Sequence, residues 1–352
     1  MYYYNIHDIL KVKSEVILYE LEYFRSSESE NPDLIVKVSK FDGGLQLKRK
    51  MTKVESHGTR NVRYSEHFGS LGAQFGITFG TDITIMVNKL IAKSKHVLYV
   101  NLVEPILRFM FISRGYVLLH SACVDKFDRT ILISAPPDTG KTTTVLKCAK
   151  MNYSFLSDDM TIIKLPNEAL CFPKPMTISA HTFNTLTSVS EIHDSRKGMK
   201  LRSLVHSKSG RSFMHKLANL NVPIFTINTI GQMIVKPPKY NIDALLDSVV
   251  VKNSGVINAL YFLARNGNEI TKVNSTEALK MAVENSDDAF LFPPYNDLLK
   301  CINIGGKTAF QLLDREKELL KSLLSTIESF IIRSDSRSWS TMISQYTEGR
   351  IS

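Results

Sequence analysis

The chain has 352 residues, which is long enough for two domains of ordinary size. Hydrophobic residues make up 43% of it and charged residues 22%, proportions that are typical of a globular protein and do not favour a disordered chain. The formal net charge of +10 indicates a negatively charged partner, such as a nucleotide, an acidic peptide, nucleic acid or an anionic membrane surface.

The N-terminus and the cysteines both predict a cytoplasmic protein. The first residues, MYYYNIHDILKVKSE, lack the apolar core of a signal peptide. We expect no transmembrane segment, because no stretch approaches about 18 uncharged apolar residues. The cysteines have neither CxxC nor zinc-ligand spacing, so we expect four buried, reduced thiols. They are Cys123, Cys148, Cys171 and Cys301.

The first part of the chain is predicted to be a β-rich N-terminal domain, residues 1–104. Short runs with alternating apolar residues favour strands, and the polar segment SSESENPD favours a loop between the first two. Residues 42–81, rich in Gly, Ser, Lys and Arg, have no clear assignment. The predicted strands cover residues 14–24, 34–41, 82–88 and 96–101.

An α/β catalytic domain is predicted for residues 105–305. A helix opens at Pro105 and ends at Gly115. Strands are then predicted over 116–119, 130–134 and 153–156, with a helix over 141–150 between the last two. Residues 166–240 favour loops and short strands. A buried strand over 256–263 and a helix over 275–283 follow.

The last segment, residues 306–352, is predicted to be a C-terminal helical extension. Its apolar residues fall on one face of a helix, and we interpret this stripe as packing rather than as a partner site. The stripe consists of Leu319, Leu320, Leu323, Leu324, Ile327, Phe330 and Ile331.

A phosphate-binding loop is predicted between the strand and the helix at 130–150. The sequence TILISAPPDTGKTTT fits the pattern GxxxxGK[ST], except that Ala135 replaces the first Gly. Backbone N–H groups of such a loop wrap phosphates at the positive end of the helix dipole. Lys141 can reach the β and γ phosphates of a nucleotide, and the Thr142 hydroxyl can bind Mg²⁺. The predicted nucleotide-binding residues are Ala135, Pro136, Pro137, Asp138, Thr139, Gly140, Lys141, Thr142 and Thr143.

Two adjacent carboxylates follow the next strand, where a bound phosphate and Mg²⁺ would lie. One of Asp158 and Asp159 can hold the metal, and the other can take a proton from an attacking hydroxyl. The alternative is that the pair only caps a turn. His120 ends the strand before the loop strand, and it faces the same site if the two strands are neighbours.

The segment LHSACVDKFDRTILISAPPDTGKTTTVLKCAKMNYSFLSDDMTII resembles the catalytic core of HPr kinase/phosphorylase and its relatives, a group related to the ATP-dependent phosphoenolpyruvate carboxykinases. The shared parts are a Leu-His pair, a hairpin, a P-loop, a helix and an Asp-Asp strand end. Weaker similarity in CFPKPMTIS and INALYFLARNGNEITKVNSTEALKMAV extends it over roughly residues 105–300. The resemblance implies ATP-dependent phosphorylation of a hydroxyl, with Lys141 and Thr142 on phosphate and Mg²⁺, one aspartate as base and His120 at the phosphate.

The resemblance has a limit, because the Gly- and Arg-containing signature that follows the core in HPr kinase/phosphorylases has no match here. The sequence is more similar to relatives of these enzymes that modify peptides or small molecules. A carboxykinase-like lyase would need a second metal site and a set of anion-binding arginines, which the sequence does not offer.

The segment 196–216, RKGMKLRSLVHSKSGRSFMHK, carries seven Lys and Arg residues and no acidic residue. It is predicted to be either a solvated face or a loop that closes over phosphate or an acidic substrate. Nucleic acid is not an expected partner, because aromatic residues do not alternate with these charges at stacking intervals.

The sequence therefore predicts a cytoplasmic kinase with ATP and Mg²⁺ as cofactors. Asp158 is the preferred base, with Asp159 and Thr142 at the metal and Lys141 and His120 at the phosphate. The acceptor is a serine or threonine of a peptide or protein, or a small-molecule alcohol, and the oligomeric state is left open, a homo-oligomer included. The alternative is a non-catalytic ATP-binding regulatory module that acts through a partner.

Overall fold

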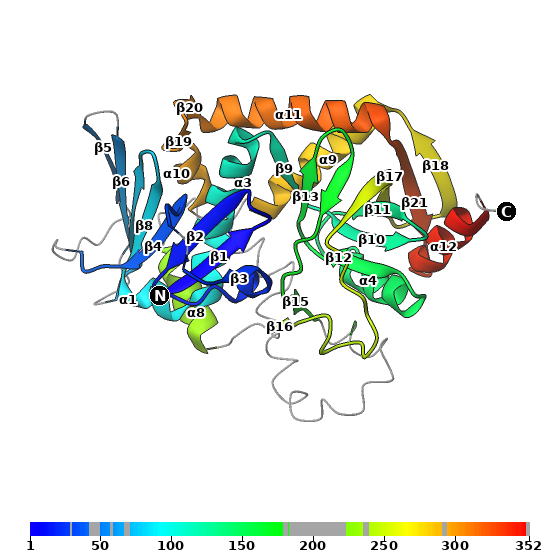
Figure 1. Ribbon diagram of the computed structural model, residues 1–352, viewed down its shortest axis with the longest axis horizontal. Helices are drawn as coiled ribbons and strands as arrows, with labels where there is room; N and C mark the ends of the chain where they lie inside the picture. The colour runs from blue at the N-terminus through cyan, green and yellow to red at the C-terminus, as the bar shows by residue number, and fades with distance from the viewer. Residues whose placement is uncertain are drawn as a thin grey trace. The chain divides into compact units, whose positions relative to one another are not determined.

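The computed structural model describes residues 1–28, 30–41, 50–56, 59–66, 71–178, 182, 223–234, 239–290 and 294–349. The protein is a mixed α/β chain with several sheets (Figure 1). Its described residues form two compact units. The first contains 1–114, 223–234 and 290–314, and the second contains 115–178, 239–289 and 315–349.

An eight-stranded sheet forms the framework of the first unit, in the order β3-β1-β2-β4-β8-β7-β6-β5. Strands β2, β4 and β8 run parallel, whereas β8, β7, β6 and β5 form an antiparallel meander. In β2 and β8 every second side chain is buried, as expected for a sheet with one covered face. The strands are β1 Tyr2–Ile6, β2 Leu10–Ser14, β3 Arg25–Ser26, β4 Leu34–Val38, β5 Lys50–Ser56, β6 Thr59–Ser65, β7 Gln74–Phe79 and β8 Ile83–Val87.

The first unit also contains helices and a small hairpin. The helices are η1 Tyr19–Phe24 (3-10), α1 Lys89–Lys93, α2 Lys95–Leu98, η2 Tyr99–Val103 (a π-helix), α3 Glu104–Ser113, α8 Ile224–Ile234 and α10 Tyr295–Leu299. The hairpin pairs β19 Asn303–Ile304 with β20 Lys307–Thr308.

Two strand predictions in this unit are wrong in whole or in part. The run 14–24 is a strand only to Ser14 and then becomes η1. The run 96–101 is helical, because α2, η2 and α3 are continuous and buried nearly all round. Strand and helix periodicities cannot be told apart in a short run whose residues are all buried. The predictions near 34–41 and 82–88 are confirmed by β4 and β8.

The helical run Lys95–Ser113 is long and apolar enough to cross a membrane, contrary to the expectation that no segment would be, yet 83% of its apolar window is buried inside the protein. A core helix passes the same test. Arg108 within this run is fully buried, donates to the Tyr295 hydroxyl (3.0 Å) and lies over the ring of Phe290. The run therefore fits the core of the first unit.

The second unit is built on a sheet that branches at its longest strand, β17 (Ser254–Ala264). Its main path is β12-β10-β11-β17-β14-β13-β9, while β21 pairs with the second half of β17 and with β18. β11, β17 and β21 run parallel. The other strands are β9 Tyr116–Leu119, β10 Ala122–Lys126, β11 Arg129–Ser134, β12 Ser154–Ser157, β13 Thr161–Lys164, β14 Glu168–Leu170, β18 Asn268–Val273 and β21 Glu328–Ser334. Outside this sheet, β15 Met176–Thr177 pairs with β16 Lys239–Tyr240.

Helices form separate cores with the two faces of this sheet. α4 (Lys141–Lys150) and α12 (Trp339–Gly349) share one core with alternate residues of β11 and β17, including Ile133 and Tyr261. α9 (Ser275–Phe290) and α11 (Ala309–Thr326) share the other, which includes Leu132 and Leu260. Because both faces are buried, the central strands are almost continuously apolar.

The predicted α/β unit is confirmed in its elements. Strand β11, helix α4 and strand β12 lie within a residue of their predicted bounds, and β9 matches 116–119. The predicted C-terminal helical stripe is wrong from Ile327 onward. α11 carries the four leucines from Leu319 to Leu324, but Phe330 and Ile331 belong to β21, where buried β-branched and aromatic residues continue the sheet. Helix α8 was not predicted.

The two units divide the chain differently from the predicted domains 1–104, 105–305 and 306–352. α3 belongs to the first unit, in which it packs on η2 and β19. The last boundary between the two units lies inside α11, between Asp314 and Arg315, and not at the predicted 305/306. A boundary set by packing between distant segments has no local signal in the sequence.

We expect Gly255→Ala to lower the free energy of unfolding by about 1–3 kcal/mol. A Cβ at this position in β17 would lie 1.9 Å from the Thr130 hydroxyl oxygen. That hydroxyl is buried and donates to Asp125 (2.6 Å), so it cannot turn away without loss of the bond. Urea unfolding measures the change. Gly231→Ala in α8 is the matched control, since its Cβ meets nothing within 4 Å, and equal stability of the two variants would contradict the prediction.

Candidate functional site

The predicted phosphate loop joins the end of β11 to the start of α4. The parallel strands β11 and β17 end side by side, with Ser134 opposite Phe262. The first intrahelical bond of α4 runs from the Thr144 N–H to the Gly140 carbonyl. The N–H groups before it, at the start of the helix, have no partner inside the helix, as at any helix N-terminus. The local geometry therefore suits an anion.

Gly140 has a local structural reason to be glycine. Its φ is 132°, which L side chains rarely adopt, and a Cβ there would lie 3.0 Å from the Trp339 ring. The Trp339 indole N–H donates to the carbonyl of Ala264 at the end of β17 (3.0 Å). Helix α12 thus packs directly on the loop. Ala135 is buried and is not among the residues with positive φ, so its replacement of Gly causes no backbone strain.

Asp158 faces the loop from the end of β12. Asp158 is 5% exposed, and its Oδ2 accepts a hydrogen bond from the Thr142 hydroxyl (3.0 Å). Its Oδ1 is buried and has no hydrogen-bond partner. An unpaired buried carboxylate oxygen is costly, so its presence beside Thr142 is consistent with a position that a ligand completes.

Asp159 lies among three basic side chains. Its Oδ2 accepts from Lys174 (2.8 Å), and its Oδ1 lies 3.5 Å from Lys141 Nζ and 3.4 Å from His120 Nε2. The Lys174 side chain is buried, at 8% exposed, and the Lys141 side chain is partly buried, at 11%. The Asp159 side chain is itself 45% exposed. It is the carboxylate that solvent or a substrate can reach.

His120 is fixed in one tautomer by its neighbours. Its Nδ1 donates to the carbonyl of Asn285 (2.8 Å), because a carbonyl can only accept. The neutral ring therefore presents the lone pair of Nε2 toward Asp159. Asn285 also donates through its side chain to the Ser134 hydroxyl (3.1 Å), which in turn donates to the His120 carbonyl (3.2 Å).

Burial and charge shift the titration of these groups in opposite directions. Burial, and then Lys141, lower the pKa of His120. Burial lowers the pKa of Lys141, and burial raises the pKa of Asp158 from 3.8 to about 6. For Asp159 burial acts upward, but Lys174 and then Lys141 outweigh it and hold its pKa well below 3.8. The two adjacent carboxyls thus titrate far apart, as paired functional carboxylates do.

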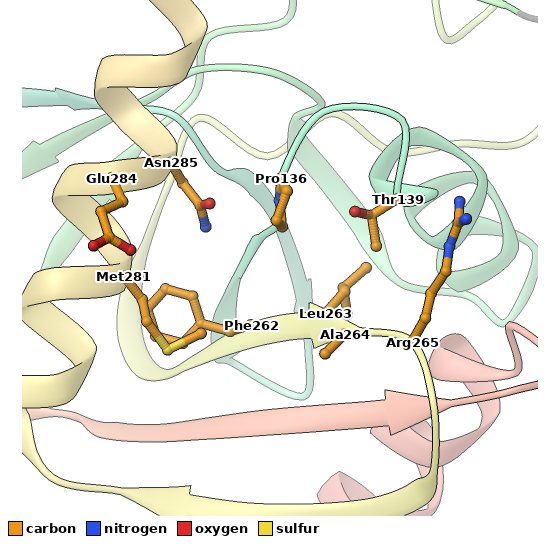
Figure 2. A pocket seen from close by; sticks show the side chains of 9 residues that line it. All are labelled: Pro136, Thr139, Phe262, Leu263, Ala264, Arg265, Met281, Glu284 and Asn285. Carbon is orange, nitrogen blue, oxygen red and sulfur yellow. The ribbon is translucent and has the colours of Figure 1, made fainter. Parts of the chain in front are cut away.

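A pocket of about 310 Å³ lies beside the loop. It opens between the loop, the end of β17 and helix α9 (Figure 2). Its apolar walls come from β17 and α9, and polar groups stand at its rim. The lining residues are Pro136, Thr139, Phe262, Leu263, Ala264, Arg265, Met281, Glu284 and Asn285. Arg265 also donates to the Asp138 carbonyl (2.8 Å), where the loop adopts a φ of 62°.

The structure brings most of the predicted site residues together. His120, Lys141, Thr142, Asp158 and Asp159 form one connected cluster. Pro136 and Thr139 line the pocket instead, and Thr143 shares a hydrogen bond with Thr182 (3.0 Å). The basic segment 196–216 lies outside the described residues.

Three residues of this region were not predicted from the sequence. Lys174 stands in the quoted segment CFPKPMTIS, where its place between two prolines in an apolar run was the available signal. Asn285 lies on α9 beyond the predicted helix end at 283. Trp339 is the single tryptophan of the chain, and only packing links it to Gly140.

The donor set fits a magnesium ion that is held together with a nucleotide. Within the described residues no three His, Cys, Asp or Glu side chains gather as a metal site. Mg²⁺ commonly takes one or two protein oxygens and completes its shell with water and phosphate. Thr142 and the unpaired oxygen of Asp158 offer such a pair. The predicted metal role of Asp159 stays a prediction, and its oxygens contact lysine and histidine here.

Comparison with known proteins gives distant structural similarity and no match in sequence. No protein-family model matches the chain, and no curated protein matches it in sequence. Among solved structures, the chain is similar to the HPr(Ser) kinase/phosphatase from Coxiella burnetii, with 9% identity and a TM-score of 0.30 over 66% of this chain and 88% of the other. A TM-score of 0.30 does not establish a common fold.

The raised pKa of Asp158 predicts a pH-dependent stability in metal-free protein. Between about 4 and 6 the folded state binds the proton more tightly than the unfolded chain, so stability falls as the pH rises through this window. Asp158→Asn removes the effect, and relative to wild type the variant should gain roughly 2 kcal/mol between pH 4 and pH 7.

Urea unfolding of both proteins in EDTA across this range measures the difference. Asp159 contributes in another window, because its lowered pKa means that its stabilisation is lost only as the pH falls below its ordinary value of 3.8. Parallel stability curves for wild type and variant between pH 4 and 7 would contradict a raised pKa at Asp158.

Proposed function

We propose that this protein is a nucleotide-dependent phosphotransferase that moves the γ-phosphate of ATP to a hydroxyl group. The observation that carries the proposal is the direct pairing of the loop's Thr142 with Asp158 and of its Lys141 with Asp159. The predicted phosphate loop therefore meets two carboxylates that titrate differently. Phosphoryl transfer needs this combination of positioned cations, a metal site and a base.

The residues of the site divide into binding and proton-transfer roles. The N–H groups at the start of α4 and the Lys141 ammonium bind phosphate oxygens. Thr142 and Asp158 would hold Mg²⁺, which would supply positive charge to neutralise phosphate. Lys174 adds a second buried cation next to Lys141, where negative charge develops in the transition state.

Access favours Asp159 as the base, although the sequence favours Asp158. A pKa near 6 would suit a base at neutral pH, but the free oxygen of Asp158 is buried away from any acceptor. Asp159 is half exposed and lies beside His120. Geometry takes precedence over pKa in the choice of a base, because a base has to contact the proton that it removes.

Nucleotide binding would itself activate Asp159. Its pKa is held low by Lys174 and Lys141, and phosphates compete for the same two ammonium groups. When these cations turn toward phosphate, the pKa of Asp159 rises and its basicity increases. His120, neutral and with Nε2 free of the Asn285 bond, can share the proton that Asp159 receives.

In the proposed reaction the acceptor oxygen forms a bond to the γ-phosphorus while the bond to the β–γ bridging oxygen breaks. ADP leaves with that electron pair, and the acceptor proton passes to Asp159. The acceptor is a serine or threonine of a peptide or protein, or a small-molecule alcohol.

We expect Asp159→Asn to lower the rate of phosphate transfer from γ-labelled ATP by about 10²–10⁴-fold while MgATP still binds. Asp158→Asn should act differently. It should raise the Mg²⁺ concentration needed for half-maximal transfer, because it removes a metal-side oxygen. Both are measured with lysate metabolites and proteins as acceptors.

Asp243→Asn, an exposed carboxylate of the same unit, is the matched control and should leave transfer unchanged. The reverse pattern, with transfer lost in Asp158→Asn at every Mg²⁺ concentration and kept in Asp159→Asn, would restore Asp158 as the base. ATP binding without transfer to any acceptor would overturn the phosphotransferase and favour a nucleotide-binding regulatory module.

Lys174→Met should lower kcat by about 10²-fold, because a buried cation that faces the transferring group is removed. Lys174→Arg keeps the charge and should recover a large part of the rate. If Lys174 served only in packing, the Met and Arg variants would have the same rate. Lys280→Met, on an exposed position of α9, serves as the control. Equal rates in wild type and Lys174→Met would contradict a role in transfer.

A further inference from the structure

The pocket beside the loop is separate from the cluster of charged residues. In the sheet, β11 has β10 and then β12 on one side and β17 on the other. Asp158 and Asp159 follow β12, whereas the pocket is formed by Phe262 to Arg265 at the end of β17. The loop after β11 therefore has the carboxylates on one flank and the pocket on the other.

This arrangement predicts how a bound nucleotide is oriented along the loop. Lys141 and Thr142, which contact the carboxylates, mark the end of the loop where the terminal phosphate lies. Pro136 and Thr139 of the same loop border the pocket (Figure 2). A nucleotide with its terminal phosphate at Lys141 can extend its nucleoside away from the carboxylates and into the space beyond Thr139.

The lining of the pocket suits a flat heterocycle. Phe262, Leu263 and Met281 line the pocket, and Met281 packs against the core cluster that contains Phe262. Aromatic rings and thioethers pack well on a planar ring. Glu284 at the rim is an acceptor that can bind an exocyclic amino group. A volume of about 310 Å³ is at the lower end for small-molecule sites.

We propose that this pocket binds the heterocyclic base of the nucleotide, an inference that rests on the proposed function. An acceptor alcohol is the competing occupant, but its hydroxyl would have to reach Asp159, which does not line the pocket. The pocket also connects to the proton-transfer residues. Asn285 borders it and, through its carbonyl, fixes the ring of His120. Base binding thus acts on α9 at the residue that orients His120.

The experiment compares the binding of MgATP with that of magnesium tripolyphosphate, which has the phosphates but no base, by titration calorimetry. Met281→Trp fills the pocket from α9. The inference predicts that MgATP binding weakens at least about tenfold in this variant and that tripolyphosphate binding does not change. Thr276→Trp places the same ring on an exposed position of α9 outside the pocket lining and should leave both affinities unchanged.

Unchanged MgATP affinity in Met281→Trp overturns the base pocket and leaves the proposed function in place. A raised KM for the acceptor with unchanged MgATP affinity has the same meaning and assigns the pocket to the acceptor. Wild-type protein provides a second test that needs no folded variant, since a base pocket requires MgATP to bind more tightly than tripolyphosphate, and equal affinities overturn it. If neither compound binds wild type, the proposed function itself fails.

Discussion

The parallel pairing of β11 with β17 is the constraint on which the site depends. The two strands end in register, with Ser134 opposite Phe262, so the loop at 135–140 and the segment at 262–265 leave the sheet at one edge. Ligand sites of parallel α/β sheets lie at this edge, where the strands deliver loops and helix N-termini. Here the same pairing positions the predicted phosphate loop and one wall of the pocket. It requires both faces of the sheet to be covered, which α4 and α12 on one side and α9 and α11 on the other provide.

The helices on the two faces also take part in the site. Trp339 of α12 lies against Gly140, and its indole N–H donates to the carbonyl of Ala264. One side chain therefore contacts both the loop and the end of β17. On the other face, Asn285 of α9 contacts two residues of the site. Its carbonyl accepts from His120, and its side chain donates to Ser134. A site held by packed helices and buried hydrogen bonds stays ordered before a ligand binds, and such preorganisation is a large part of catalytic power.

The contrast between the two aspartates follows from their surroundings and not from their sequence. Asp158 is buried against Thr142 with one oxygen unpaired, whereas Asp159 is half exposed among Lys141, Lys174 and His120. Burial dominates the first carboxyl and raises its pKa, while neighbouring cations dominate the second and lower it. A phosphate ligand would reverse the second balance, since it attracts the same lysines.

The sequence by itself determined the local elements and the short-range chemistry of the loop. The strand before the loop, the helix 141–150 and the strand that ends at the two aspartates were all predicted, because glycine, lysine and apolar periodicity act over a few residues. Tertiary structure decided the rest. It made 96–101 a helix inside a buried run, and it placed Phe330 in a strand where a helical stripe was predicted. It also brought Lys174 and Trp339 to the loop and gave the two carboxylates unequal access, because these contacts join residues far apart in the chain that no local pattern relates.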